Sequence, residues 1–318
     1  MAVISDVLVQ GAQMLLVLAL APGLTGFVRK IKARLLRRQG APVLQPYRDL
    51  VRLMRKEAIV AESASWLFRI APYLVFASIW VAAALVPTFA RGLIFSWSAD
   101  LIAIVALLGS ARFFLALAGL DVGTSFGGIG SSREMMIASL AEPAMLIIVF
   151  TMSLLAGSTQ LASIVAYMQG PGVGVRVSLY LALVAMVVVA LAENARIPVD
   201  NPATHLELTM VHEAMVLEYS GRHLAMIELG AALKLVLYLS LIVAIFAPWG
   251  MATADADLSR HLVGAGLYVV KLAVGGALLG YFETAIAKMR VFRVPQFLGA
   301  ALMFGLLAAL LLFVSRSV

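Results

Sequence analysis

Eight apolar windows, each close to the length that crosses a lipid bilayer, constrain the fold of this chain more than any other feature. A spanning helix needs about 20 predominantly apolar residues. The windows cover residues 7–28, 66–88, 100–119, 135–157, 176–192, 225–249, 262–282 and 295–314. Apolar residues occupy 63% of the 318 positions and charged residues only 13%, whereas about half of a soluble domain is apolar. We therefore expect an all-α integral membrane protein with eight transmembrane helices in a single membrane domain, residues 1–318.

The lysines and arginines set the expected orientation of these helices. Sixteen of the 24 lie in the segments after the first, third, fifth and seventh windows, and four lie in the segments on the opposite side. Because basic loops stay on the cytoplasmic side of a membrane, both termini are expected outside. No basic residue precedes the first window, and Arg29, Lys30 and Lys32 follow it, so we interpret this window as a retained helix and not as a secretory signal. The basic run after it is interpreted as a topology signal that contacts anionic lipids, in preference to a nucleic acid site.

Residues that hold redox cofactors are scarce in this sequence. There is no cysteine, so the chain can hold neither an iron–sulfur cluster nor a disulfide. The four histidines (His205, His212, His223 and His261) lie in or beside expected loops, where no pair could ligate a haem inside the membrane. We expect no catalytic residue, no metal site and no cofactor held by this chain, with any electrons carried by partner proteins.

Several charged residues lie inside windows that are otherwise apolar. An ionisable group in hydrocarbon costs ~2.5 to 3.5 kcal/mol on insertion scales and usually marks a polar pathway. These residues are Glu142, Glu193, Glu228, Lys234, Lys271 and Glu283. Counted at about 1.5 Å per residue from the inner helix ends, they extend from the inner side to the midplane and stop there. This predicts a water-filled funnel that is open to the cytoplasm, from which a proton would leave sideways through a neighbouring subunit. Alternatively, Lys234 and Lys271 form structural ion pairs with buried acids, which is compatible with a role in passing protons.

Two of the inner-side segments have a pattern of their own. The run YRDLVRLMRKE at residues 47–57 places Leu50, Leu53 and Met54 on one stripe, which predicts a short amphipathic surface helix. It would dock on the membrane or on a partner, or else form a solvated charge run. The run GLDVGTSFGGIGSSRE at residues 119–134 contains five glycines, which permit close approach of backbones or form a flexible connector.

The segment from Glu193 to His223 carries the most polar chemistry. Pro198 and Pro202 are expected to keep its start extended, and residues 203–219 then have helical periodicity. On such a helix Glu207 and Glu218 share a face, because eleven residues at about 100° per residue bring them nearly into line. A carboxylate stripe beneath the bundle would take protons from the inner water; a solvated amphipathic face is the alternative.

Particular stretches of this sequence resemble the NADH dehydrogenase subunit 1 family of respiratory complex I. The resemblance is stronger to its counterparts in membrane-bound group 4 [NiFe] hydrogenases, of the formate hydrogenlyase and hydrogenase-4 type. The stretches are ARLLRRQGAPVLQPYRDLVRLMRKE (33–57), ARFFLALAGLDVGTSFGGIGSSREMM (111–136), AEP (141–143), AENARIPVD (192–200), EYSG (218–221), VVKLAVG (269–275) and FETAIAKMR (282–290).

The resemblance implies a membrane anchor and coupling subunit in a bacterial cytoplasmic membrane. It implies soluble hydrogenase-like large and small subunits and an iron–sulfur subunit on the inner face, which carry iron–sulfur clusters and a [NiFe]-like site, and antiporter-like membrane subunits alongside. The proton path it implies, together with the charge distribution above, comprises Glu142, Glu193, Glu207, Glu213, Glu218, Glu228, Lys234, Lys271 and Glu283. The junction with the soluble subunits comprises Arg34, Arg37, Arg38, Gln45, Arg48, Asp49, Arg133, Arg196 and Asp200.

Three function classes stay open on the sequence. Quinone-type members of the family carry a denser carboxylate cluster between Asp200 and Glu218, so the resemblance favours a hydrogenase-type coupling subunit over a quinone-binding subunit of an NADH:quinone oxidoreductase. A stand-alone secondary transporter is the third class, and such folds usually show an internal repeat with interrupted helices. We find no such repeat in the sequence.

Overall fold

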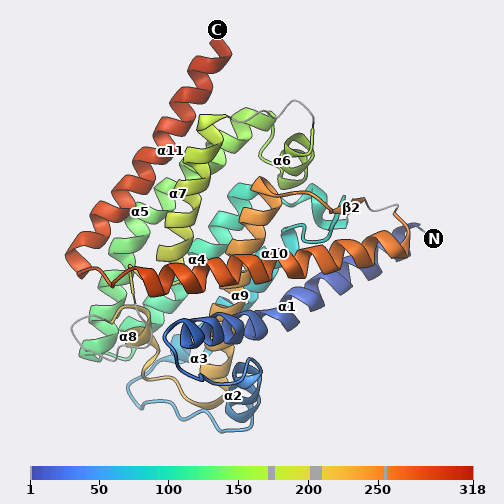
Figure 1. Ribbon diagram of the computed structural model, residues 1–318. Helices are drawn as coiled ribbons and strands as arrows, with labels where there is room; N and C mark the ends of the chain where they lie inside the picture. Colours follow the sequence, from blue (N-terminus) through green and yellow to red (C-terminus); the bar gives the residue numbers. More distant parts are fainter. Residues whose placement is uncertain (1, 93, 171–175, 201–209, 254–255, 318) are drawn as a thin grey trace.

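The structure is a computed structural model that describes residues 2–92, 94–170, 176–200, 210–253 and 256–317. Most of these residues form eight long helices, which Figure 1 shows. They are α1 (Ala2–Leu35), α3 (Trp66–Leu85), α4 (Leu101–Asp121), α5 (Ser125–Ala156), α7 (Val177–Glu193), α9 (Gly221–Phe246), α10 (Leu258–Ala285) and α11 (Val294–Ser317). Shorter elements connect them: the helices α2 (Gln45–Met54), α6 (Leu161–Met168) and α8 (His212–Val216), the 3-10 turns η1 (Ile94–Trp97) and η2 (Val291–Arg293), and the strands β1 (Ala90–Arg91) and β2 (Ala252–Thr253).

The expectation of an all-α membrane protein is confirmed. Among the described residues, seven helices are long and apolar enough to cross a membrane. The eighth apolar helix, α7, has only 17 residues, which corresponds to about 25 Å of rise against the ~30 Å of a bilayer core. The expected number of eight spans is therefore approximate, with α7 as the short member.

The long helices run in two directions. Figure 1 shows α3, α4, α5, α7, α9 and α11 as an upright bundle, in which α11 packs against α5 and α7, and α4 packs between α3 and α5. Helices α1 and α10 run side by side and cross this bundle at a steep angle. We call the end of the molecule with α2 and α8 the α2 end, and the opposite end, with α6 and the parallel pair of β1 and β2, the α6 end.

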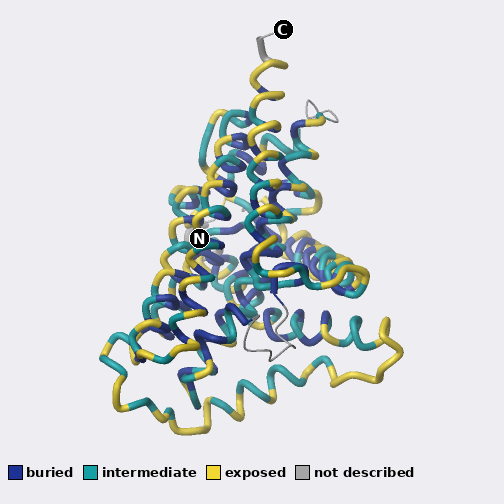
Figure 2. Tube along the Cα trace, turned by 90° about the vertical axis from the view of Figure 1, so that its left-hand side faces the viewer, coloured by how far each residue is buried: buried dark blue, intermediate teal, exposed yellow. Residues whose placement is uncertain are grey.

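The expected amphipathic helix is present as α2 (Gln45–Met54), which has no buried residue. Figure 2 shows the long segment that carries α2 as a mostly exposed or half-buried strap beneath the bundle, whereas dark buried positions fill the interior. The helix packs against α9 and the middle of α1. Tyr47 fixes it there, since its hydroxyl donates to the carbonyl oxygen of Ala19 in α1.

The glycine-rich segment differs from a flexible connector, because most of it is the first part of α5. Helix α5 begins at Ser125, capped by the Thr124 side chain, and only Val122–Thr124 form the turn after α4. The glycines allow close packing: a Cβ at Gly127 would collide with the carbonyl oxygen of Gly119, and one at Gly130 would lie 2.9 Å from Cβ of Ala214. The close-approach interpretation is confirmed and the connector interpretation is wrong.

This packing predicts opposite effects for two neighbouring glycines. Gly127→Ala is expected to destabilise the protein by about 3 kcal/mol, because the new methyl group meets rigid backbone. Gly128→Ala is the matched control, since no atom lies within 4 Å of its Cβ position, and alanine in a helix stabilises by about 0.5 to 1 kcal/mol. Thermal unfolding of the two purified variants measures the difference; equal melting temperatures would contradict this packing.

The helix expected over residues 203–219 is not continuous in the part that the structure describes. Residues 201–209, and with them Glu207, lie outside the described residues. Between residues 210 and 219 only His212–Val216 are helical, and Glu218 lies in the turn that follows. The helix stops because Tyr219 stacks on Phe68, with ring centroids 3.9 Å apart, and donates its hydroxyl to the Phe68 carbonyl oxygen. The expected carboxylate stripe on one long helix is therefore wrong at its Glu218 end.

Candidate functional site

An arginine in the middle of α4 organises a buried group of charges. The Arg112 side chain is 2% exposed, and it pairs with Glu193 through Nη2 and with Glu134 through Nε at 3.1 Å. Its Nη1 lies 3.7 Å from Oε1 of Glu142. On the other side of Glu193, Oε2 lies 2.9 Å from Nζ of Lys234. We call these five residues the Arg112 cluster.

Four helices contribute to the Arg112 cluster. Arg112 comes from α4, Glu134 and Glu142 from α5, Glu193 from the last turn of α7 and Lys234 from α9. Glu134 and Glu142 are eight residues apart, which is about two helical turns and places both on one face of α5. The two cations and three carboxylates neutralise most of each other's charge, as buried ions require.

A tyrosine completes the environment of Glu193. The buried Tyr238 lies next to this carboxylate. Glu193 thus has Arg112, Lys234 and Tyr238 around one carboxyl group.

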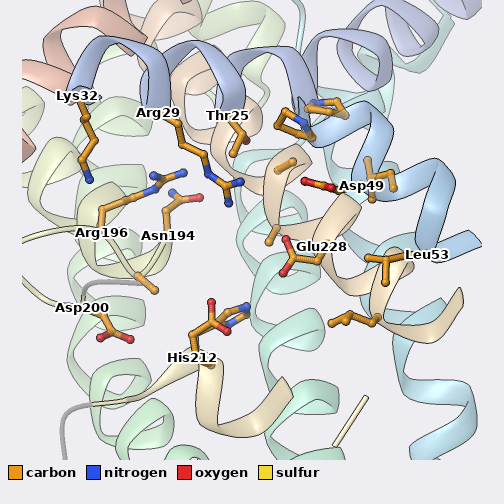
Figure 3. Close-up of a pocket in the computed structure, with 18 of the residues that line it drawn as sticks. Thr25, Arg29, Lys32, Asp49, Leu53, Asn194, Arg196, Asp200, His212 and Glu228 are labelled. Atoms are coloured by element: carbon orange, nitrogen blue, oxygen red, sulfur yellow. The ribbon is translucent and has the colours of Figure 1, made fainter. Parts of the chain in front are cut away.

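A large cavity reaches toward the Arg112 cluster from the α2 end. This entry cavity has a volume of about 700 Å³. Its walls come from α1, α2, α9 and the segment after α7: Pro22, Thr25, Arg29, Lys32, Pro46, Asp49, Leu50, Arg52, Leu53, Asn194, Ala195, Arg196, Asp200, His212, Glu213, Leu224, Glu228, Ala231 and Ala232. Figure 3 shows Lys32, Arg29 and Arg196 gathered beneath α1, with Asp49 and Glu228 across the space from them.

A smaller chamber links the entry cavity to the Arg112 cluster. This inner chamber has a volume of about 70 Å³, and its lining includes Arg112, Glu134, Glu193 and Lys234. It shares four lining residues with the entry cavity: Asn194, Ala195, His212 and Ala231. Polar space therefore leads from the α2 end to the centre of the bundle.

Glu142 faces a different space. Its side chain is 45% exposed and lines a lateral cavity of about 440 Å³ between α4 and α5. The other lining residues are Ile102, Val105, Ala106, Gly109, Arg112, Phe113, Met135 and Leu146. Pro143 follows Glu142 inside α5 and removes one helical N–H, which frees the carbonyl of Ser139 as an extra acceptor. The carboxylate therefore lies on the flank of the bundle and not in the funnel.

A second ion group lies where α1 and α10 meet the segment after α7. The side chain of Glu283 is 1% exposed; it pairs with Lys32 at 2.7 Å and with Arg196 at 3.6 Å. Burial and the nearby Arg29 lower the pKa of Arg196 from its usual range, against the opposing effect of Glu283. Next to this group Lys288 pairs with Asp200 at 2.8 Å.

Lys271 lies apart from the other charged residues of the expected proton path. Its ammonium group donates to the carbonyl oxygens of Ala247, at 2.7 Å, and of Trp249, just past the end of α9 at the α6 end. Within the described ranges it forms no ion pair, so the alternative of structural pairing with a buried acid is wrong for Lys271. The depth count failed because α10 crosses the bundle steeply, so that rise along this helix is not depth across the membrane.

The residues expected at the junction with soluble subunits fall into two groups. Arg34, Arg37, Arg38 and Arg48 are exposed at the α2 end, and Gln45 donates to Asp49 at 3.0 Å beside them. The others are engaged inside the protein: Arg133 donates to the Met210 carbonyl oxygen at 2.8 Å, and Arg196 and Asp200 belong to the ion pairs described above. Of the remaining acids, Glu213 and Glu228 line the entry cavity.

Comparison with known proteins identifies the family of this fold. The sequence model of the NADH dehydrogenase family matches residues 9–314. This chain belongs to the NADH dehydrogenase family. It is similar to formate hydrogenlyase subunit 4 of Escherichia coli, with 33% identity over 93% of this chain and 95% of that protein, and to hydrogenase-4 component C of the same organism, with 33% identity over 88% and 87%. NADH-ubiquinone oxidoreductase chain 1 of Triticum aestivum is 28% identical over 74% of this chain and 73% of its own length.

The fold is shared with one chain of a solved membrane complex. A chain of the membrane-bound sulfane sulfur reductase, an archaeal respiratory membrane complex, superposes with a TM-score of 0.83 over 96% of this chain and 99% of its own length. Its sequence identity is 17%, so this likeness concerns the fold alone. The expected resemblance to the subunit 1 family and to its hydrogenase counterparts is confirmed.

Sequence reasoning missed three members of the site. Arg112 was visible as the arginine inside an apolar window, but nothing in the sequence shows that three carboxylates surround it. Glu134 was assigned to a loop, and only the earlier start of α5 aligns it with Glu142. Tyr238 reads as an ordinary residue of an apolar helix and gives no signal before its neighbours are known.

Proposed function

We propose that this chain is the membrane anchor and coupling subunit of a complex I-like oxidoreductase of the group 4 hydrogenase type. In this role it joins redox chemistry in soluble subunits to the movement of protons, or of Na⁺, in the membrane. The similarity to formate hydrogenlyase subunit 4 and hydrogenase-4 component C supports the type of complex. The observation that carries the proposal is the line of buried charges between the entry cavity and the lateral cavity.

The proposed route begins at the α2 end, which we assign to the cytoplasm with both termini outside. Glu228 and Glu213 in the entry cavity collect protons, with Asn194 and His212 at the passage into the inner chamber. Lys234 and Glu193 then hold the proton beside Arg112, and Glu142 delivers it to the flank of the bundle. Glu207 and Glu218 remain candidates for the cytoplasmic end, Glu283 for the wall beneath α1, and Lys271 is left out of the route.

The flank at Glu142 is the proposed contact for an antiporter-like membrane subunit. A carboxylate that is 45% exposed between two spanning helices is costly against lipid. A neighbouring subunit with a polar or basic side chain at this depth would remove that cost and receive the proton. The exposed basic face of α2 and the preceding loop would hold the soluble subunits, which carry the iron–sulfur clusters and a [NiFe]-like site, and would also contact anionic lipid headgroups.

Purification through a tag on this chain tests the proposed assembly. We expect soluble subunits with iron–sulfur clusters and at least one further multi-span subunit to co-purify from gently solubilised bacterial membranes, and mass spectrometry identifies them. Recovery of the chain alone, active as a carrier in vesicles, would contradict the proposal and favour a secondary transporter.

A quinone-binding subunit of an NADH:quinone oxidoreductase is the second candidate. The entry cavity favours it, because apolar Leu50 and Leu53 on α2 lie across the space from the basic Arg29 and Arg196, which would suit an amphipathic ring with a long apolar tail. Inhibition of the purified complex by quinone-site blockers would select this candidate over the hydrogenase type.

A further inference from the structure

Two cavities meet at one side chain. The inner chamber and the lateral cavity have a single lining residue in common among those described, and it is Arg112. The inner chamber holds Glu134 and Glu193, whereas the lateral cavity holds Glu142. A charge that crosses the wall shared by the two spaces therefore passes the guanidinium of Arg112.

The contacts of this guanidinium are unequal on the two sides. It makes close ion pairs with Glu193 and with Glu134 at 3.1 Å, whereas Glu142 lies at 3.7 Å. An arginine does not give up its proton in a protein, so Arg112 cannot itself pass a proton along. Its planar fork can exchange one carboxylate for another with a small movement, since both partners already lie within ion-pair distance.

We propose that Arg112 is the gate between the inner chamber and the lateral cavity, and that it works by exchanging its ion pair between Glu193 and Glu142. This proposal rests on the function proposed above and names the residue that controls the route. Arg112 acts through the two carboxylates, so it is a positioning residue.

The steps of this gate balance in protons and charge. A proton from Lys234 neutralises Glu193 and breaks its attraction to Arg112, and Lys234 is reprotonated from the entry cavity. The guanidinium then moves to Glu142, where its positive charge favours the ionised carboxylate and releases the proton that Glu142 carried. In the return step Glu193 passes its proton to Glu142, becomes an anion again and recovers Arg112. One proton enters from the inner chamber and one leaves at the lateral cavity in each cycle.

The gate explains two features that a passive channel does not need. Glu142 lies within ion-pair distance of Arg112 but has a looser contact than Glu193, as expected of the unoccupied position of a two-position switch at rest. The ion pair with Lys234 keeps Glu193 in place when the guanidinium leaves.

A charge-conserving substitution separates the gate from simple structural support. Arg112→Lys keeps the positive charge, but a lysine lacks the planar fork that can face two carboxylates. We expect this variant in the tagged complex to assemble and to translocate roughly 10-fold fewer protons per electron, the scale of loss when a positioning partner is removed. The exposed Arg69→Gln at the start of α3 is the matched control and is expected to keep the wild-type ratio.

Infrared difference spectroscopy during a pH titration of the complex measures the protonation of the two carboxyl groups. A coupling between their protonation would not be seen if Arg112 only supported the structure. The carboxyl bands of Glu193 and Glu142 are assigned by their loss in Glu193→Gln and Glu142→Gln. In the wild type we expect protonation of Glu193 to be accompanied by deprotonation of Glu142, and in Arg112→Lys we expect the two bands to titrate independently.

Two results would overturn the gate. One is a wild-type proton-to-electron ratio in Arg112→Lys, and the other is independent titration of the two bands in the wild type. A wild-type complex that translocates no ion but shows the linked bands would instead refute the proposed function and leave the gate intact.

Discussion

Exchange of Glu142 for glutamine is expected to reduce proton translocation on the order of 100-fold, the low end of what a positioned proton donor contributes. The amide has nearly the shape of the carboxyl group but cannot take up a proton. Because Glu142 is half-exposed and its contact with Arg112 is 3.7 Å long, its loss leaves Arg112 paired with Glu134 and Glu193. The complex should therefore still assemble and transfer electrons. Acidification of vesicles that contain the complex, followed with a pH-sensitive dye during electron transfer, measures the effect.

The control for this variant is Glu62→Gln. Glu62 is an exposed carboxylate in the loop before α3 and lines none of the cavities described above. We expect it to translocate as the wild type does. If Glu142→Gln pumps equally well, the lateral cavity is not the exit of the route.

Replacement of Lys234 by methionine is expected to have a similarly large effect, again roughly 100-fold on translocation. Lys234 lines the inner chamber and its Nζ lies 2.9 Å from Glu193, so it is the last proton donor before the gate. Methionine fills a similar volume without a titratable group. Glu193 keeps Arg112 and Tyr238, which limits the cost of removing one partner from a buried pair, otherwise about 3 to 5 kcal/mol. The same vesicle assay, with the amount of assembled complex measured in parallel, tests this.

Lys271→Met provides the matched comparison. Lys271 is also a lysine within a long apolar helix, but it donates to the carbonyl oxygens at the end of α9 and lies apart from the Arg112 cluster. We expect this variant to retain translocation. An equal loss of translocation in Lys234→Met and Lys271→Met would show that Lys271 also belongs to the proton route, although it lies apart from the Arg112 cluster.

The sequence was sufficient for the class of the fold because membrane helices are specified by length and apolar content. Seven of the expected windows correspond to helices of spanning length, and the amphipathic run at residues 47–57 corresponds to α2. The sequence was insufficient where tertiary contacts decide a boundary. Helix α5 begins at Ser125 because glycines let it pack on α4 and α8, and α8 is short because Tyr219 stacks on Phe68.

The candidate site was predictable in its composition but not in its pairing. Glu193 and Lys234 were expected in one polar region and are paired in the structure, since each is a costly charge in an apolar helix. Which partner each charge has depends on helix tilt, and tilt cannot be read from residue spacing. The steep crossing of α10 therefore separates Lys271 from the Arg112 cluster and brings Glu283 to Lys32 on α1.

The most direct test of the proposed route determines the side of the membrane from which water enters the cavities. The chain has no cysteine, so a single introduced thiol reports its own position. Ala231→Cys places a thiol where the entry cavity meets the inner chamber, with Glu62→Cys and Asp257→Cys as references for the α2 end and the α6 end. We expect a charged, membrane-impermeant thiol reagent to label Ala231→Cys from the cytoplasmic side, together with Glu62→Cys, and to label Asp257→Cys only from the outside. Labelling of Ala231→Cys from the outside, or from neither side, would contradict a proton route that is filled from the cytoplasm.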